Sequence, residues 1–452
     1  MSWHLRQSTP RLKCWGKLGL LLIWVIALFM LLPVVWAANQ GDLDPTFGNG
    51  GIVMSSADPF SPVGVDAIAL QGDNKIVIAG QSSSLGFFLL ARYKSNGELD
   101  NTFGQGGIVT TTIPNFYLVG KGLAIQTDGK IVVVGGALGR REAFALARYN
   151  SNGELDNTFG RGGIVTTTIH GTSLFANEVA LQTDGKIVVV GSSATNEDDD
   201  YLELVAVARY KNNGALDSTF GPGGIVTTTI PGPNAEGEAI VLQPDGKIVV
   251  VGVDWSNSSS SFLARWKTDG KLDNTFDQDG VITIPGFFGA ANDVVIQVDG
   301  KILVGSSAFA LARYRPQGDL DNDFGHGGIV TTTFDTPSGE GSGSAIAIQP
   351  DGRIIVAGTA YYQFDDPYYE LDAIALARYD VNGKLDRSFN NTGIVTTTLS
   401  SGKWGVWATD VVIQPDRKIV VAGSFGIEGD GIVLARYLNA LEFYLPLIRK
   451  NS

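Results

Sequence analysis

The sequence predicts an all-β protein: a seven-bladed β-propeller of four-stranded antiparallel blades. A motif of the form Leu-Asp-x-Thr-Phe-Gly returns seven times with small changes, at intervals of 48 to 65 residues. Each period also contains a turn close to Gln-x-Asp-Gly-Lys and a strand end close to Ala-Arg-Tyr. Outside an apolar stretch near the N-terminus, no segment has the apolar spacing of a helix. Repeats of this length and strand content indicate a propeller or a solenoid. The motif starts at Leu43, Leu99, Leu155, Leu216, Leu272, Leu320 and Leu385.

Residues 122–169 illustrate the order of strands within one period. A short apolar strand at 122–126 is followed by Asp128-Gly129, a two-residue hairpin signal because both positions tolerate positive φ. The β-branched run at 130–135 lacks alternation, as expected of a strand buried on both faces. A third strand follows at 143–149 and a threonine-rich fourth at 164–168, whose wettable side chains suit a sheet edge. Four antiparallel strands per repeat favour a propeller blade, with a solenoid as the alternative.

The two ends of the repeat region complement each other. The first motif precedes only one outer strand, at 52–55, whereas the last repeat, at 409–437, supplies only three strands. The N-terminal strand is therefore predicted to complete the last blade and close the ring, which removes its open ends. The predicted organisation is an N-terminal signal or anchor at 1–38, a propeller at 39–437 and a C-terminal tail at 438–452.

The repeated residues resemble a known family. Leu-Asp-x-Thr-Phe-Gly-x-Gly-Gly, together with Gln-x-Asp-Gly-Lys and Ala-Leu-Ala-Arg-Tyr, is similar to the delta-60 repeat over about residues 41–437. Departures are local, since 277–280 and 390–393 replace the glycine-rich segment in two repeats. The resemblance implies a β-propeller of unknown function from an exported bacterial protein, and it brings no established activity.

The charge of the chain and its N-terminal segment limit where the protein is expected and what it is expected to bind. The chain carries 46 acidic and 33 basic residues, and four of the bases lie in the first 37 residues, which contain no acid. An acidic body argues against a nucleic-acid partner. A basic start, an apolar run at 18–36 and small residues near Ala37 predict a secretion signal, with an uncleaved membrane anchor as the alternative. The protein is thus expected outside the cell or on its surface.

The only cysteine, Cys14, precedes the apolar run, so no disulfide is expected in the exported part.

Two charged residues occur at one position in every repeat: an arginine such as Arg148 and an aspartate such as Asp156. A ring of functional charges is one interpretation. The sequence favours the other, a structural ion pair that pins the third strand to the following segment, because arginine forms fixed bidentate contacts with carboxylates.

Sequence variation is concentrated in the loops expected at the opposite end of each blade from the Asp-Gly turns. Variable loops on a rigid scaffold commonly carry binding. Aromatic residues in these loops are expected to border the channel mouth, where they suit an extracellular glycan, peptide or protein. The alternative is that they cap the blade cores. The candidate ligand-binding residues are Phe116, Tyr117, Phe175, Trp255, Phe287, Phe288, Tyr361, Tyr362, Trp404 and Trp407.

Metal binding and catalysis find less support in the sequence. Two acidic loops offer carboxylates that could hold Ca²⁺, although no Asp-x-Asp-x-Asp-Gly loop is present and a solvated loop is the alternative. No other cofactor is predicted. His170 and His326 are expected on opposite faces, so they should not act together. The candidate metal-binding residues are Asp198, Asp199, Asp200, Asp365 and Asp366.

The sequence therefore favours an exported, non-enzymatic binding or surface-interaction module whose ligand binds on the face with the variable loops. The alternative is a propeller-type hydrolase or lyase that uses carboxylates at the channel mouth. The apolar tail from Phe443, followed by Arg449 and Lys450, is either a sorting or surface-retention signal or an extra strand or tail packed on the last blade.

Overall fold

The computed structural model describes residues 36–56, 63–82, 84–195, 202–230, 232, 234–256, 260–284, 289–336, 339–362, 372–399, 405–426, 431–440 and 442–444. The chain forms two compact units. One unit comprises residues 40–439, and the other combines residues 1–39 with 440–452. All regular elements in the described ranges are β-strands, as the sequence predicts.

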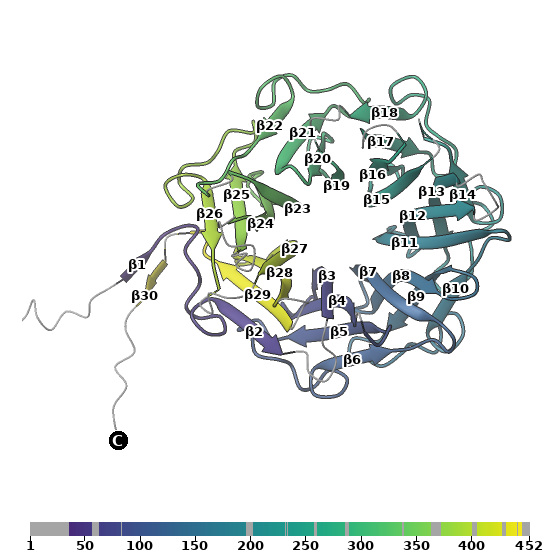
Figure 1. Ribbon diagram of the computed structural model, residues 1–452, viewed down its shortest axis with the longest axis horizontal. Helices are drawn as coiled ribbons and strands as arrows, with labels where there is room; N and C mark the ends of the chain where they lie inside the picture. The colour runs from purple at the N-terminus through teal and green to yellow at the C-terminus, as the bar shows by residue number, and fades with distance from the viewer. Residues whose placement is uncertain are drawn as a thin grey trace, which may run out of the picture. The chain divides into compact units, whose positions relative to one another are not determined.

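The unit at 40–439 contains seven four-stranded antiparallel sheets arranged around a centre, which confirms the predicted seven-bladed propeller (Figure 1). In blades 1 to 6 the first strand along the chain is innermost and the fourth is outermost. Blade 1 consists of β3 (Val63–Leu70), β4 (Ile76–Ser82), β5 (Phe88–Tyr93) and β6 (Ile108–Thr111). Blade 2 consists of β7 (Tyr117–Ile125), β8 (Ile131–Leu138), β9 (Ala143–Tyr149) and β10 (Ile164–Thr167). Blade 3 consists of β11 (Thr172–Leu181), β12 (Ile187–Thr195), β13 (Leu202–Tyr210) and β14 (Ile225–Thr228).

The next three blades repeat this order. Blade 4 consists of β15 (Ala235–Leu242), β16 (Ile248–Asp254), β17 (Ser260–Trp266) and β18 (Val281–Ile284). Blade 5 consists of β19 (Ala291–Ile296), β20 (Ile302–Ser306), β21 (Ala310–Tyr314) and β22 (Ile329–Thr331). Blade 6 consists of β23 (Gly341–Ile348), β24 (Ile354–Ala360), β25 (Ala373–Tyr379) and β26 (Ile394–Thr397).

Blade 7 is built from both ends of the unit. Its inner strands are β27 (Val406–Ile413), β28 (Ile419–Phe425) and β29 (Gly431–Tyr437). Its outermost strand is β2 (Ile52–Ser56), which pairs antiparallel with β29 from Ile52 opposite Ala435 to Ser56 opposite Gly431. In Figure 1 the purple β2 lies beside the yellow β29. The predicted closure of the ring by the N-terminal strand is confirmed.

The hydrophobic core is divided among the joints between blades. Seven clusters of buried residues occur in the described ranges, and each combines side chains of two neighbouring blades. One cluster, for example, joins Val133 of blade 2 to Leu90 of blade 1. The threonine run of the outer strand also serves a joint, since Tyr149 donates its hydroxyl to Thr111 of the preceding blade at 2.7 Å. Each blade therefore depends on both neighbours for burial of its faces.

The repeated arginine and aspartate form a buried clamp, as the sequence favours. Arg148 bonds Asp156 through Nε and Nη2, each at 2.8 Å from Oδ2. Its Nη1 donates to the backbone oxygen of Asn212 in the next blade, and its guanidinium lies 4.6 Å from the ring centre of Phe159. Thr158 bonds the same carboxylate at 2.7 Å. The motif Asp-x-Thr-Phe thus supplies the acid, its hydroxyl donor and the ring beneath the arginine.

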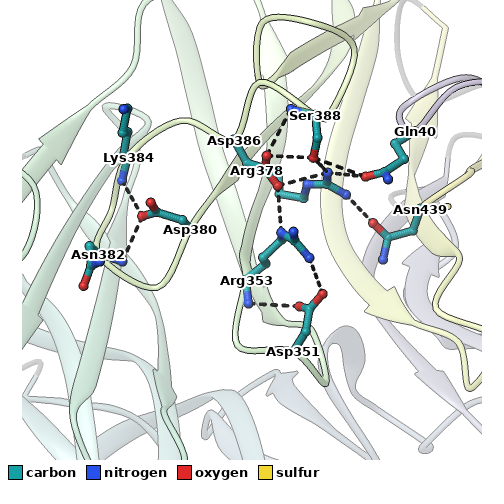
Figure 2. A network of polar contacts seen from close by, with 10 residues as sticks. All are labelled: Gln40, Asp351, Arg353, Arg378, Asp380, Asn382, Lys384, Asp386, Ser388 and Asn439. Carbon is teal, nitrogen blue, oxygen red and sulfur yellow. Dashed lines mark hydrogen bonds and ion pairs between the residues drawn. The ribbon is translucent and has the colours of Figure 1, made fainter.

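The corresponding clamp of blade 6 holds both ends of the propeller unit (Figure 2). Arg378 contacts Asp386 at 3.0 Å and Ser388 at 2.8 Å. Its Nη2, which makes both of these contacts, also donates to the side chain of Gln40, and its Nη1 donates to that of Asn439. Gln40 and Asn439, the first and last residues of the unit, therefore both accept hydrogen bonds from the guanidinium of Arg378.

The second unit contains one small sheet. Strand β1 (Trp36–Ala38) pairs antiparallel with β30 (Glu442–Tyr444), so residues 442–444 of the C-terminal tail form a strand with the N-terminal segment. The apolar run at 18–35 lies outside the described residues. Within the described ranges, no helix is long and apolar enough to span a bilayer.

Candidate functional site

The innermost strand of every blade contains a β-bulge at the same place. At each bulge the pairing with the second strand skips one residue. A bulge redirects a side chain away from the regular ladder. Although the innermost strands are otherwise largely apolar, every bulged residue is polar: Asp66, Lys121, Asn177, Glu238, Asn292, Ser344 and Thr409.

A glycine on the second strand makes room for this bulge. In blade 2, Gly135 pairs with Gly120, immediately before the bulged Lys121. A Cβ atom at Gly135 would overlap the carbonyl oxygen of Val119. The corresponding overlap with an innermost-strand carbonyl occurs at Gly80, Gly191, Gly252, Gly358 and Gly423. The glycine that ends the Val-Val-Val-Gly run therefore allows the close approach of the bulged backbone.

The bulges surround a cavity of about 190 Å³ to which all seven innermost strands contribute side chains. Figure 1 shows these strands around the centre of the ring. We call this cavity the channel site. Its charged lining residues are Asp66, Lys121, Glu178, Glu238, Asp293 and Asp410, and its polar neutral ones are Asn177, Asn292, Ser344 and Thr409.

Three of the channel carboxylates accept a backbone hydrogen bond from the next blade. Glu178 of blade 3 accepts from the amide of Ile240 at 2.8 Å. Asp293 of blade 5 accepts from the amide of Ile346 at 2.5 Å. Asp410 of blade 7 accepts in the same way from blade 1, where the amide of Ile68 lies at 2.8 Å. These three acids occupy one position of the repeat, four residues before the repeated glutamine.

Asp66 and Lys121 form the one ion pair of the described channel residues, with 2.9 Å between Lys121 Nζ and Asp66 Oδ1. The other oxygen of Asp66 is buried and has no hydrogen-bond partner. On another side of the channel site, Asn177 donates to Glu236 at 2.9 Å and to the carbonyl of Gly237 at 3.0 Å. The site therefore offers both hydrogen-bond acceptors and one cation.

Burial raises the pKa of the channel carboxyls, although each keeps part of its surface open to the cavity. It raises the pKa of Asp293 to about 6, even though two backbone amides act in the opposite direction. Burial and the charge of Asp293 raise the pKa of Asp410 to about 7. Burial and the charge of Glu236 raise the pKa of Glu238 to about 7. Groups that exchange protons near neutrality are suited to acid–base chemistry and to pH sensing.

The aromatic candidates lie at the end of the blades opposite the Asp-Gly turns, which we call the loop face. Tyr117 begins β7 and Trp407 is the second residue of β27, while Trp255 follows β16. These three side chains are 38%, 37% and 53% exposed. They come from blades 2, 7 and 4. All the described aromatic side chains with large exposure therefore lie on the loop face.

The other described aromatics are more enclosed, as the core-capping alternative expects. Phe116 packs against the cluster between blades 1 and 2. Phe175 is half-buried against Gly136. Tyr361 is half-buried, and the hydroxyl of Tyr362 lies 3.5 Å from Thr396 Oγ1. Phe116 and Phe175 therefore contribute to packing between blades.

Several predicted residues lie outside the described ranges, namely Phe287, Phe288, Trp404, Asp198, Asp199, Asp200, Asp365 and Asp366. Among the residues that the structure describes, no group of three or more His, Cys, Asp or Glu side chains is placed to bind a metal. His170 lies between β10 and β11 and His326 lies between β21 and β22, at opposite ends of their blades.

The channel carboxyls were not among the residues singled out from the sequence. One signal was present: Glu178, Asp293 and Asp410 each introduce an acid into an apolar strand. The acid occurs in only three of the seven repeats, and the same position is alanine or glycine in the others. Since the sequence does not reveal the bulge, an acid at this position is interpreted as the first residue of a strand.

Seven segments of the chain match the model of a family described as a domain of unknown function (DUF5122) β-propeller. No curated protein matches the sequence. The matched segments are residues 71–103, 126–159, 182–220, 243–276, 297–324, 349–389 and 414–439.

Solved structures share the architecture at low sequence identity. A catalytically inactive virginiamycin B lyase from Staphylococcus aureus with quinupristin is 12% identical, and the match covers 86% of this chain and 99% of that one with a TM-score of 0.50. The WD40 β-propeller domain of Doa1 is also 12% identical, with 86% and 95% covered and a TM-score of 0.48. Likeness at this level concerns the fold alone.

Proposed function

We propose that this chain, which belongs to the DUF5122 β-propeller family of unknown function, is an exported, non-enzymatic binding module. Its ligand is a glycan or a peptide that binds on the loop face. The observation that carries this proposal is the exposure of Tyr117, Trp255 and Trp407 on that face. Exposed aromatic rings stack on sugar rings and on apolar peptide side chains, and they are enriched in binding sites.

The face that carries the Asp-Gly turns differs from the loop face, and this difference supports the same proposal. There the repeated charged residues are used in the scaffold: Asp156 is bonded by Arg148 and Thr158 and lies 3.3 Å from Lys130. The residues that vary between repeats are concentrated at the loop face and in the channel site. A ligand specific to this chain is expected to contact the residues that vary, because the shared residues already have structural partners.

Arrays of glycans and peptides, probed with residues 39–452 in the presence and absence of Ca²⁺, test the proposal. Replacing Trp407 or Trp255 with alanine should weaken binding to the strongest hit at least tenfold, about 1.4 kcal/mol. Val298→Ala is the matched control, because Val298 is an exposed apolar side chain in a turn at the other end of its blade. Equal binding by all three variants would contradict the loop face as the site.

A second candidate function is a hydrolase or lyase that uses channel carboxyls. One observation favours it: Glu238 and Asp410 both have a pKa of about 7, which suits a general acid or base. The array hits serve as substrates for this test. Product formation that is lost in Glu238→Gln while binding is retained would support catalysis, and binding without turnover supports the first proposal.

Export is tested separately by mass spectrometry of the protein in the culture medium and in the membrane fraction. The proposal expects an N-terminus near residue 38 in the medium. A full-length chain found only in the membrane fraction would support the anchor instead.

A further inference from the structure

We propose that Glu178, Asp293 and Asp410 form a proton-sensitive lock on three joints of the ring. With a proton bound, these side chains hold neighbouring blades together. When ionised, they repel one another and loosen the joints. The inference concerns regulation of the propeller itself, and it does not depend on the identity of any ligand.

The lock rests first on the contacts across the joints. The three carboxyls accept backbone amides of the next blade at 2.8, 2.5 and 2.8 Å. They connect blade 3 to 4, blade 5 to 6, and blade 7 to 1. The last of these joins blade 7, the blade that closes the ring, to blade 1. Each accepting oxygen can remain an acceptor when the group is protonated, because a neutral carboxyl retains a carbonyl oxygen.

The placement of the acids in alternate blades is the second observation. The equivalent residues of blades 4, 6 and 1, which supply the amide donors, are Ala239, Ala345 and Ala67. All three alanines are buried. Carboxyls therefore never occupy this repeat position in two successive blades. The blade that donates the amide to each acid has a small alanine at the equivalent position.

The charges around the lock come from six of the seven innermost strands. The described innermost strands carry Asp66 on β3, Lys121 on β7, Glu178 on β11, Glu236 and Glu238 on β15, Asp293 on β19 and Asp410 on β27, and none on β23. Glu203 on β13 adds its charge near Glu236 and Glu238. Lys121 is the only cation among them, and it pairs with Asp66. Ionising all the acids would thus leave a strongly negative channel.

The direction of the effect follows from the raised pKa values. Burial raises the pKa of Glu178 well above its usual range, and the charges of Asp293 and Asp410 raise it further. The pKa values of Asp293 and Asp410 rise to about 6 and 7. A group that binds its proton more tightly in the folded state stabilises the fold at low pH, and that contribution is lost as pH rises through the raised pKa. The contacts of Asp293 and Asp410 are therefore closed at about pH 5 and open above pH 7.

Thermal unfolding of the full chain between pH 5 and 8 tests the lock. The melting temperature of the wild-type protein should fall by about 5 °C over this range. The fall should be clearly smaller in the triple variant Glu178→Gln, Asp293→Asn, Asp410→Asn, in which Glu238 still titrates. The matched control is Asp184→Asn, Asp299→Asn, Asp416→Asn, which removes three exposed acids from the opposite ends of the same three hairpins. Its pH dependence should remain that of the wild type. Equal pH dependence in the triple variant and the wild type would overturn the proposal.

A measurement on the wild-type chain decides the question even if the triple variant fails to fold. All three amide donors belong to isoleucine, so selective nitrogen-15 labelling of isoleucine reports on each lock by NMR. The amide signals of Ile346 and Ile68 should shift with midpoints near pH 6 and pH 7, the pKa values of Asp293 and Asp410, and that of Ile240 should shift when Glu178 titrates. The signal of Ile131, a strand residue of β8, should not shift. Signals that stay fixed through this range would refute the lock.

Discussion

Removing the guanidinium of Arg148 should cost several kcal/mol of folding stability, because this side chain serves two blades at once. Arg148 and Asp156 are 2% and 4% exposed. Breaking a buried ion pair from one side costs about 3–5 kcal/mol, since a buried charge loses its partner. Lys130, at 3.3 Å from Asp156, remains as a weaker partner and reduces this cost. Loss of the contact with Phe159 adds roughly 0.5–2 kcal/mol. We therefore expect Arg148→Ala to lower the free energy of unfolding by about 3–4 kcal/mol.

Urea denaturation followed by tryptophan fluorescence measures this loss. Lys94→Ala is the control, because Lys94 forms an exposed pair with Glu98 at 2.9 Å, and such pairs contribute at most about 1 kcal/mol. Arg148→Lys should recover only part of the stability, since lysine cannot make the bidentate contact. A loss below about 1 kcal/mol for Arg148→Ala would refute the clamp as a stabilising device. Intact stability with lost ligand binding would instead assign the arginine to function.

Three further predictions concern the ring. Gly135→Ala should lower the melting temperature by several degrees because its Cβ would overlap the bulged strand, whereas Gly72→Ala, at a position with open space, should not. Deleting residues 41–55 should destabilise all seven blades together in calorimetry, because it removes most of β2; an unchanged transition would contradict the closure. Stability should also fall as pH drops from about 4 to 2. Burial raises the pKa of Asp44 and Asp100, but hydrogen bonds from threonine and the neighbouring cations together outweigh it and lower the pKa to about 2. These carboxylates contribute only while ionised, and an acid titration of the melting temperature that stayed flat would show that they do not.

The scaffold could be predicted from the sequence because its residues recur. Arg148 and Asp156 have counterparts in every repeat, so a shared structural role was the simplest explanation. The strand order followed from turns such as Asp128-Gly129, whose conformation is local. The count of blades followed from a missing fourth strand at one end and an extra strand at the other.

The channel site could not be predicted in the same way. Its acids differ from repeat to repeat, and their convergence depends on a bulge that interrupts the pairing of each innermost strand. Alternation of side chains along the strand is lost at that point, so sequence spacing does not reveal which way Asp293 or Asp410 points. The aromatic candidates were only partly distinguished, because Trp407 and Phe175 occupy the same position of their repeats and yet differ in exposure.

The pairing of β2 with β29 has a consequence for synthesis of the chain. Strand β2 leaves the ribosome before every other strand of the propeller, and its partner leaves last. Until then its apolar residues Ile52 and Val53 have no sheet to join, and contacts of such long sequence separation form slowly. A nascent chain must keep this strand from aggregating throughout translation. Premature termination in the last repeat would therefore release a protein with two unmatched blade faces, which quality-control proteases should recognise.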